Sequence, residues 1–96
     1  MNTVRVASIE KEQLATLHFP SQEVLDSKEA KDQRLKDLER ALTLGNLDHI
    51  KIKLIFADNE GDKQVETTVW GITDKRVILK QGLLIPIHRV KEVRII

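Results

Sequence analysis

The sequence predicts an α+β domain, in which one or two N-terminal helices pack on a five-stranded antiparallel sheet that is strongly bent or closed into a small barrel. Three observations support this prediction. Leu35, Leu38 and Leu42 form a stripe at helical spacing. In residues 50–56 the apolar residues Ile50, Ile52, Leu54 and Phe56 recur at every second position, with Lys51 and Lys53 between the first three, as in a half-buried strand. Residues 65–88 are rich in Val, Ile and Thr, which pack well on a pleated surface and lose side-chain freedom in a helix.

Length and composition indicate a single domain over residues 1–96. The chain has 41% hydrophobic and 32% charged residues, an ordinary globular balance, and its net charge of +1 creates no whole-molecule field for nucleic acid or anionic lipid. The absence of cysteine excludes disulfides and zinc–thiolate sites. No apolar run reaches the ~18 residues that span a bilayer. Because no signal peptide is visible either, we expect a cytoplasmic protein of bacterial type without membrane contact.

The first twenty residues carry two alternative patterns. Residues 3–7 alternate weakly, as a strand does, whereas Ser8 is placed to cap a short helix over residues 9–17. Pro20 ends any helix before it, and Phe19 is expected to pin the segment to the rest of the chain. Strand, helix and disorder all remain open for this segment.

Residues 21–45 carry the clearest helical pattern. Asp26 and Glu29 fit a capping box, and Ser27 is an equally suitable N-cap. Gly45, followed by an asparagine, predicts the end of the helix, because a glycine there can adopt the left-handed conformation. The first half of the helix is almost wholly charged, so it either projects into solvent or offers a surface to a partner. The candidate interface residues on this surface are Lys28, Lys31 and Arg34.

Residues 46–96 carry the β pattern. Five short strands are expected, at residues 50–56, 64–72, 76–80, 83–87 and 92–96, with a tight turn at 88–90. Gly71 inside the second strand indicates a bulge or a sharp bend. Pro86 lacks a backbone N–H, so the fourth strand is an edge strand or ends there. Five such strands are too few for a sandwich, but they suffice for a bent sheet or a closed barrel.

The C-terminal sequence resembles that of known small barrels. Residues 82–93 read Gly-Leu-Leu-Ile-Pro-Ile-His-Arg-Val-Lys-Glu-Val, which is similar to the glycine, proline strand, one-turn kink and closing strand of SH3-like and Sm-like barrels. A helix followed by five strands is also the Sm-like order. The Thr-Asp-Lys-Arg turn at residues 73–76 is similar to a turn of bacterial PH-like domains, and the C-terminal half resembles a short uncharacterised bacterial protein family. These resemblances imply a small β-barrel and leave the activity open, because such folds host many functions.

Patterns that indicate catalysis or metal binding are missing from the sequence. His18, His49 and His88 lie in three separate segments without ligand spacing, and the four glycines are isolated, so they form no phosphate-binding loop. Residues 58–62 resemble a calcium loop but lack its distal glutamate. The sequence therefore predicts no enzyme, no metal, no cofactor and no small-molecule substrate.

The leading functional hypothesis is a non-catalytic interaction module that contacts another protein or self-associates. Trp70 is a candidate interface residue together with the charged start of the helix, because tryptophan is enriched at interface hot spots. The alternative role for Trp70 is packing against the core or the helix.

The alternative function is an Sm-like nucleic-acid binder that uses the basic C-terminal strands. Residues 75–96 hold six Lys and Arg residues against the single acid Glu92, and they could meet a phosphate backbone if the third and last strands adjoin. Solvated outer faces and protected sheet edges would account for the same residues. The candidate nucleic-acid-binding residues are Lys75, Arg76, Lys80, Arg89, Lys91 and Arg94.

Overall fold

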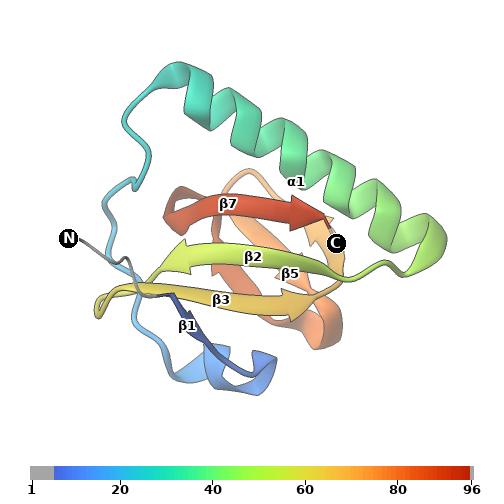
Figure 1. Cartoon of the computed structure of the whole chain (residues 1–96), viewed down its shortest axis with the longest axis horizontal. Helices are drawn as coiled ribbons and strands as arrows, with labels where there is room; N and C mark the ends of the chain where they lie inside the picture. Colours follow the sequence, from blue (N-terminus) through green and yellow to red (C-terminus); the bar gives the residue numbers. More distant parts are fainter. Residues whose placement is uncertain (1–5, 96) are drawn as a thin grey trace.

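One long helix and two β-sheets make up the fold (Figure 1). The computed structural model describes residues 6–95. In chain order the elements are β1 (Ala7–Ser8), the 3-10 helix η1 (Lys11–Thr16), α1 (Lys28–Asp48), β2 (Ile52–Ala57), β3 (Asp62–Thr67), β4 (Val69–Ile72), β5 (Arg76–Leu79), η2 (Lys80–Gly82), β6 (Leu84–Pro86), η3 (Ile87–Arg89) and β7 (Val90–Ile95). Figure 1 shows α1 along one side of the molecule and η1 on the other, with the strands between them. The predicted α+β class is therefore confirmed.

The strands form two sheets, so the single five-stranded sheet of the sequence prediction is wrong. The larger sheet has the order β1-β3-β2-β7, and the smaller one has the order β4-β5-β6. In the larger sheet β2 pairs antiparallel with both β3 and β7, and Ile52 faces Thr67 on one side and Ile95 on the other. The short β1 is parallel to β3, with Ala7 opposite Lys63. Within residues 6–95 no ladder joins the two sheets into a closed barrel.

The predicted strand over residues 64–72 divides at Thr68, and this division creates the second sheet. The backbone N–H of Lys80 donates to the carbonyl oxygen of Thr68 at 2.9 Å, and the chain pairs with β5 from Val69 onward. A bulge follows, because Val69 faces Leu79 and Gly71 faces Ile78, which leaves Trp70 without an opposing residue. The bend predicted for this segment is thus present.

The other predicted strands lie within two residues of their observed bounds. The predicted tight turn near residue 88 is η3. β6 is an edge strand of the smaller sheet, as Pro86 predicts. Local alternation and turn residues therefore predicted most of the elements correctly, and the pairing of the strands was the part that failed.

Helix α1 begins at the second of the two predicted caps. The side chain of Ser27 accepts a hydrogen bond from the backbone N–H of Ala30 at 3.1 Å, so Ser27 and not Asp26 is the N-cap. Within the described residues, no helix combines the length and apolar character that a membrane crossing requires.

The helix continues past Gly45, so the predicted end of the helix is wrong. It stops at His49, which adopts the left-handed conformation with φ 54° and whose N–H donates to the carbonyl oxygen of Gly45. A Cβ atom at position 45 would lie 2.5 Å from the carbonyl oxygen of Val69. Gly45 is therefore required for the close approach of α1 to β4, and it does not terminate the helix.

The core lies between α1, the two sheets and η1. Leu38 and Ala41 of the helix are fully buried against strand residues such as Phe56 and Ile85. Leu35 is 47% exposed, so it does not pack on the sheet with Leu38 and Leu42 as predicted. The buried face runs instead from Leu38 through the small residues that allow β4 to approach the helix.

The N-terminal segment closes the opposite side of the core. It contains a 3-10 helix, η1, with Leu14 buried, inside the range 9–17 for which a short helix was one of the open alternatives. The ring of Phe19 packs on Phe56 with 5.8 Å between ring centroids, which confirms that Phe19 pins the segment. The start of the alternating pattern, residues 3–5, lies outside the described residues.

Candidate functional site

Arg89 is a buried structural residue in this fold. Its guanidinium donates hydrogen bonds to the carbonyl oxygens of Ala57 at 2.8 Å, Gln22 at 2.8 Å and Asp58 at 3.3 Å. Only 8% of the residue is exposed. Arg89 therefore ties the N-terminal segment to the end of β2, and its charge is not presented on the surface.

Lys91 and Arg94 lie on β7 and form salt bridges there. Lys91 Nζ is 2.9 Å from an Asp62 carboxylate oxygen, and Arg94 Nε is 3.0 Å from Glu92 Oε1. The third predicted strand corresponds to β5, which pairs with β4 and β6, whereas β7 pairs with β2. The expectation that the third and last strands adjoin is therefore wrong, and these two residues lie on a different sheet from Arg76, the one cation of β5.

The remaining predicted cations, Lys75, Arg76 and Lys80, are exposed. In the part of the chain that the structure describes, none of the three forms a salt bridge. Their charges are therefore free to act on a ligand.

The candidate interface residues at the start of α1 also divide into two kinds. Lys28 and Lys31 are exposed, whereas Arg34 is buried. The Arg34 guanidinium donates to both carboxylate oxygens of Glu23, at 2.6 and 2.7 Å, and to the carbonyl oxygen of Val90 at 3.2 Å. These hydrogen bonds, opposed by partial burial, lower the pKa of the Glu23 carboxyl from 4.5 to about 2.

An apolar surface covers the side of the smaller sheet that faces away from the core. Across this sheet Gly71 faces Ile78, and Ile78 faces Leu84 on the next strand. Trp70 is 50% exposed and Leu84 is 47% exposed, while their neighbours Val69 and Ile85 are fully buried. The interface role predicted for Trp70 stays open, and the alternative of core packing is wrong. We call the surface made by Trp70, Ile78, Leu84 and Arg76 the outer face.

A cavity of about 590 Å³ continues the outer face at one end. Arg76 faces Pro86 two residues beyond the Ile78–Leu84 pair, and both of these residues line the cavity. Phe19 and Ile87 contribute apolar walls. The structure brings together here three predicted site residues, which are Arg34, Lys75 and Arg76.

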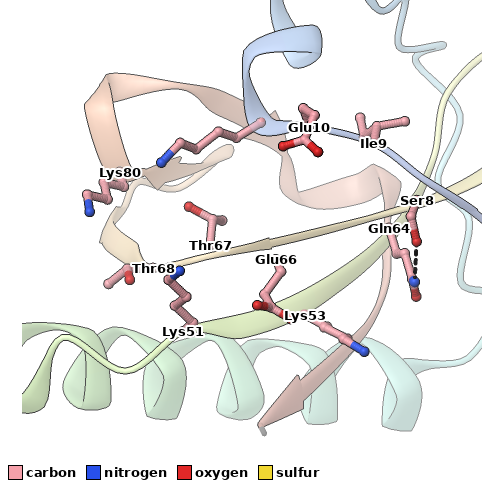
Figure 2. A pocket seen from close by; sticks show the side chains of 11 residues that line it. Ser8, Ile9, Glu10, Lys51, Lys53, Gln64, Glu66, Thr67, Thr68 and Lys80 are labelled. Carbon is pink, nitrogen blue, oxygen red and sulfur yellow. Dashed lines mark hydrogen bonds between the residues drawn. The ribbon is translucent and has the colours of Figure 1, made fainter.

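A second cavity, of about 440 Å³, lies between the N-terminal segment, β2, β3 and η2 (Figure 2). We call it the lysine groove. Its charged lining residues are Lys11, Lys51, Lys53, Lys80, Glu10 and Glu66. Of these the sequence prediction included only Lys80. Strand alternation places Lys51 and Lys53 on one side of the chain, but no sequence signal relates them to Lys11.

Within residues 6–95 no group of three His, Cys, Asp or Glu side chains is placed to hold a metal ion. Comparison of the chain with protein-family models, with curated proteins and with solved structures found no match. The proposals below therefore depend on the geometry of the outer face and of the lysine groove.

Proposed function

We propose that this chain is a non-catalytic interaction module that binds a protein partner on its outer face. The observation that carries the proposal is the exposure of Trp70 on β4 and of Leu84 on β6, on a sheet where Gly71, the residue after Trp70, faces Ile78 and Ile78 faces Leu84. Exposed aromatic and aliphatic side chains in one contiguous patch are typical of protein interaction surfaces, and tryptophan is a frequent hot-spot residue.

Charge complementarity favours an acidic partner segment that also carries apolar residues. Lys75 and Arg76 flank the apolar row, and residues 75–91 contain no Asp or Glu. A two-fold dimer whose axis passes near Arg76 would bring that cation against its own copy, so self-association in that arrangement is disfavoured. An acidic segment would instead gain electrostatic attraction together with apolar burial.

We also propose that the domain is a variant of the SH3-like and Sm-like architecture. If β3 and β4 are counted as one bent strand, a helix is followed by five strands, with the one-turn η3 before the last of them. This order supports the proposal, and β1 would then be an addition to the shared plan.

Selection from a random peptide library on the purified domain tests the protein-binding proposal. We expect enriched peptides that combine Asp or Glu with apolar residues. Binding should shift the emission of Trp70, the single tryptophan of the chain. The variants Trp70→Ser and Leu84→Ser should weaken binding about tenfold or more. Leu35→Ser is the matched control, because Leu35 is as exposed as Leu84, at 47%, and lies ten residues, about 15 Å along α1, before the Gly45 contact with β4. Peptides that bind Trp70→Ser as well as the unaltered chain would refute the proposal.

A nucleic-acid ligand is the second candidate for the same face. A half-exposed Trp70 could stack on a base while Lys75 and Arg76 contact phosphates. This candidate predicts salt-sensitive binding of a single-stranded oligonucleotide, measured by fluorescence anisotropy and weakened by Arg76→Glu. If no oligonucleotide binds at low ionic strength, this candidate is eliminated.

A further inference from the structure

We propose that the lysine groove binds a phosphorylated polyol, a small ligand that carries two or more phosphate groups together with free hydroxyls. The groove shares no residue with the outer face, so this proposal is independent of the protein-binding function.

The charges of the groove are unbalanced. Four lysines and two glutamates line it, a difference of +2. None of these lysines forms a salt bridge with a carboxylate in residues 6–95. Lys53 lies opposite Glu66 in the β2–β3 ladder, yet Figure 2 shows the Lys53 amino group directed away from the Glu66 carboxylate. Because cations grouped in one groove repel one another, a bound anion would stabilise the arrangement.

An unsatisfied hydroxyl in the wall of the groove supplies a second observation. Thr67 is 3% exposed, and its Oγ1 has no hydrogen-bond partner in the described part of the chain. Figure 2 shows its side chain directed into the space between Glu10 and Lys80, on the opposite side of β3 from Lys53 and Glu66, so the groove wraps around the edge of this strand. An unpaired buried hydroxyl has lost its hydrogen bonds to water without replacing them, which destabilises the fold. A ligand oxygen that accepts its hydrogen would supply the missing partner.

The adjacent Thr68 has its methyl group turned towards the helix. A Cβ atom at Gly45 would lie 2.9 Å from Thr68 Cγ2, so the methyl group packs against α1. The hydroxyl of Thr68 therefore does not occupy the position next to α1. Thr68 is also one of the residues that line the groove. It provides a further polar group near the lysines.

The size and lining of the groove define the ligand class. A volume of about 440 Å³ suits a small molecule, because ligand pockets span roughly 300–1,000 Å³. Among residues 6–95 no aromatic ring lines the groove, so stacking of a nucleobase has no platform there. Lysine binds phosphate as a point charge, while Glu10 and Glu66 accept hydrogen bonds from hydroxyls. Phosphates and hydroxyls on one molecule match both kinds of group.

Titration calorimetry and thermal unfolding with fructose bisphosphate at low ionic strength test this proposal. Two partial probes separate the contributions of the two groups: fructose carries only the hydroxyls, and inorganic pyrophosphate carries only the phosphates. We expect the bisphosphate to raise the Tm, to bind more tightly than either partial probe, and to shift the amide NMR signals of Gln64, Thr67 and Thr68. Lys53→Glu and Lys80→Glu should each weaken binding about tenfold, whereas Trp70→Ser should leave it unchanged.

Lys36→Glu is the matched control, because Lys36 is an exposed lysine of α1 outside the groove and the variant makes the same change in net charge. Equal weakening by Lys36→Glu and Lys53→Glu would show attraction by net charge alone and would overturn the proposal. The proposal is also overturned if the bisphosphate leaves the Tm unchanged, or if an oligoribonucleotide binds through these lysines and the bisphosphate does not. Thr67→Val should weaken binding several-fold. Unchanged affinity in this variant would show that the Thr67 hydroxyl does not contact the ligand.

Discussion

Thr67 is a polar residue at a buried, inward-facing position of β3, where an apolar residue is usual. It lies opposite the fully buried Ile52, and its hydroxyl has no hydrogen-bond partner in the described residues. Replacing an unsatisfied hydroxyl by a methyl group of similar shape removes a desolvation cost. We therefore expect Thr67→Val to raise the free energy of unfolding of the ligand-free protein by about 1 kcal/mol in urea denaturation.

The reverse change at the neighbouring inward position is the control for Thr67→Val. Val65 lies two residues earlier on the same face of β3 and is 1% exposed. Val65→Thr introduces a buried hydroxyl and should lower the free energy of unfolding by about 2 kcal/mol. A destabilised Thr67→Val variant would mean that the hydroxyl has a partner in solution, and it would weaken the argument for the lysine groove as well.

The fate of the basic residues shows what a sequence can predict at the residue scale. Grouping cations by their position in the chain placed Arg89 and Lys80 in one set. Arg89 is buried because it finds carbonyl acceptors at Gln22 and Ala57, which are 67 and 32 residues away in the chain. No local pattern predicts such distant acceptors. Trp70 was named as an interface candidate from its residue type alone, whereas its exposure at the bulge in β4 depends on strand pairing that no local pattern predicts.

At the scale of elements, α1 and β4 approach each other closely at Gly45. Of the glycines that the structure describes, Gly45 leaves the least room for a Cβ atom. A Cβ atom at Gly45 would lie 2.5 Å from Val69 O and 2.9 Å from Thr68 Cγ2. Glycine to alanine inside a helix usually stabilises a protein by about 1 kcal/mol. Here the clash dominates, and we expect Gly45→Ala to lower the free energy of unfolding by about 2 kcal/mol in urea denaturation.

Asn46→Ala is the control for Gly45→Ala. Asn46 is the next residue of α1 and is exposed, so alanine there should raise the free energy of unfolding by a few tenths of a kcal/mol through helix propensity alone. Equal stabilisation by both substitutions would show that α1 and β4 are farther apart in solution.

The element predictions succeeded where the signal is local and failed where packing decides. Ser27 was among the predicted caps, because capping depends on a few adjacent residues. Gly45 was predicted to end the helix by the same kind of local rule, but its absent side chain serves the contact with β4. Likewise the apolar alternation continues through Thr68, and only the hydrogen bond from Lys80 divides β3 from β4. The same division left the lysine groove invisible in the sequence.

At the scale of the whole molecule, the Arg34–Glu23 pair connects segments that are distant in the chain, and a second ionised carboxylate, Asp58, holds the turn between β2 and β3. Arg34 joins Glu23 of the N-terminal segment to α1 and to the first residue of β7. Burial raises the pKa of Asp58, but hydrogen bonds from Lys63 and from the N–H groups of Glu60 and Gly61 outweigh it and lower that pKa overall. Both carboxylates therefore favour the folded state only while they are ionised.

These lowered pKa values predict that the molecule loses stability in acid. The Glu23 pKa is about 2 in the folded protein against an ordinary 4.5, so its contribution is complete above pH 4.5 and is lost as the pH falls towards 2. Because the Glu23 side chain is 27% exposed, solvent screening reduces this contribution to about 1–2 kcal/mol.

Urea denaturation across this pH range should show a smaller acid-induced loss of unfolding free energy for Glu23→Gln than for the unaltered chain. The variant should be less stable near neutral pH, since Arg34 is then buried without its counter-charge. Parallel pH profiles for the two proteins would mean that the Glu23–Arg34 pair does not hold the N-terminal segment to α1 and β7 in solution.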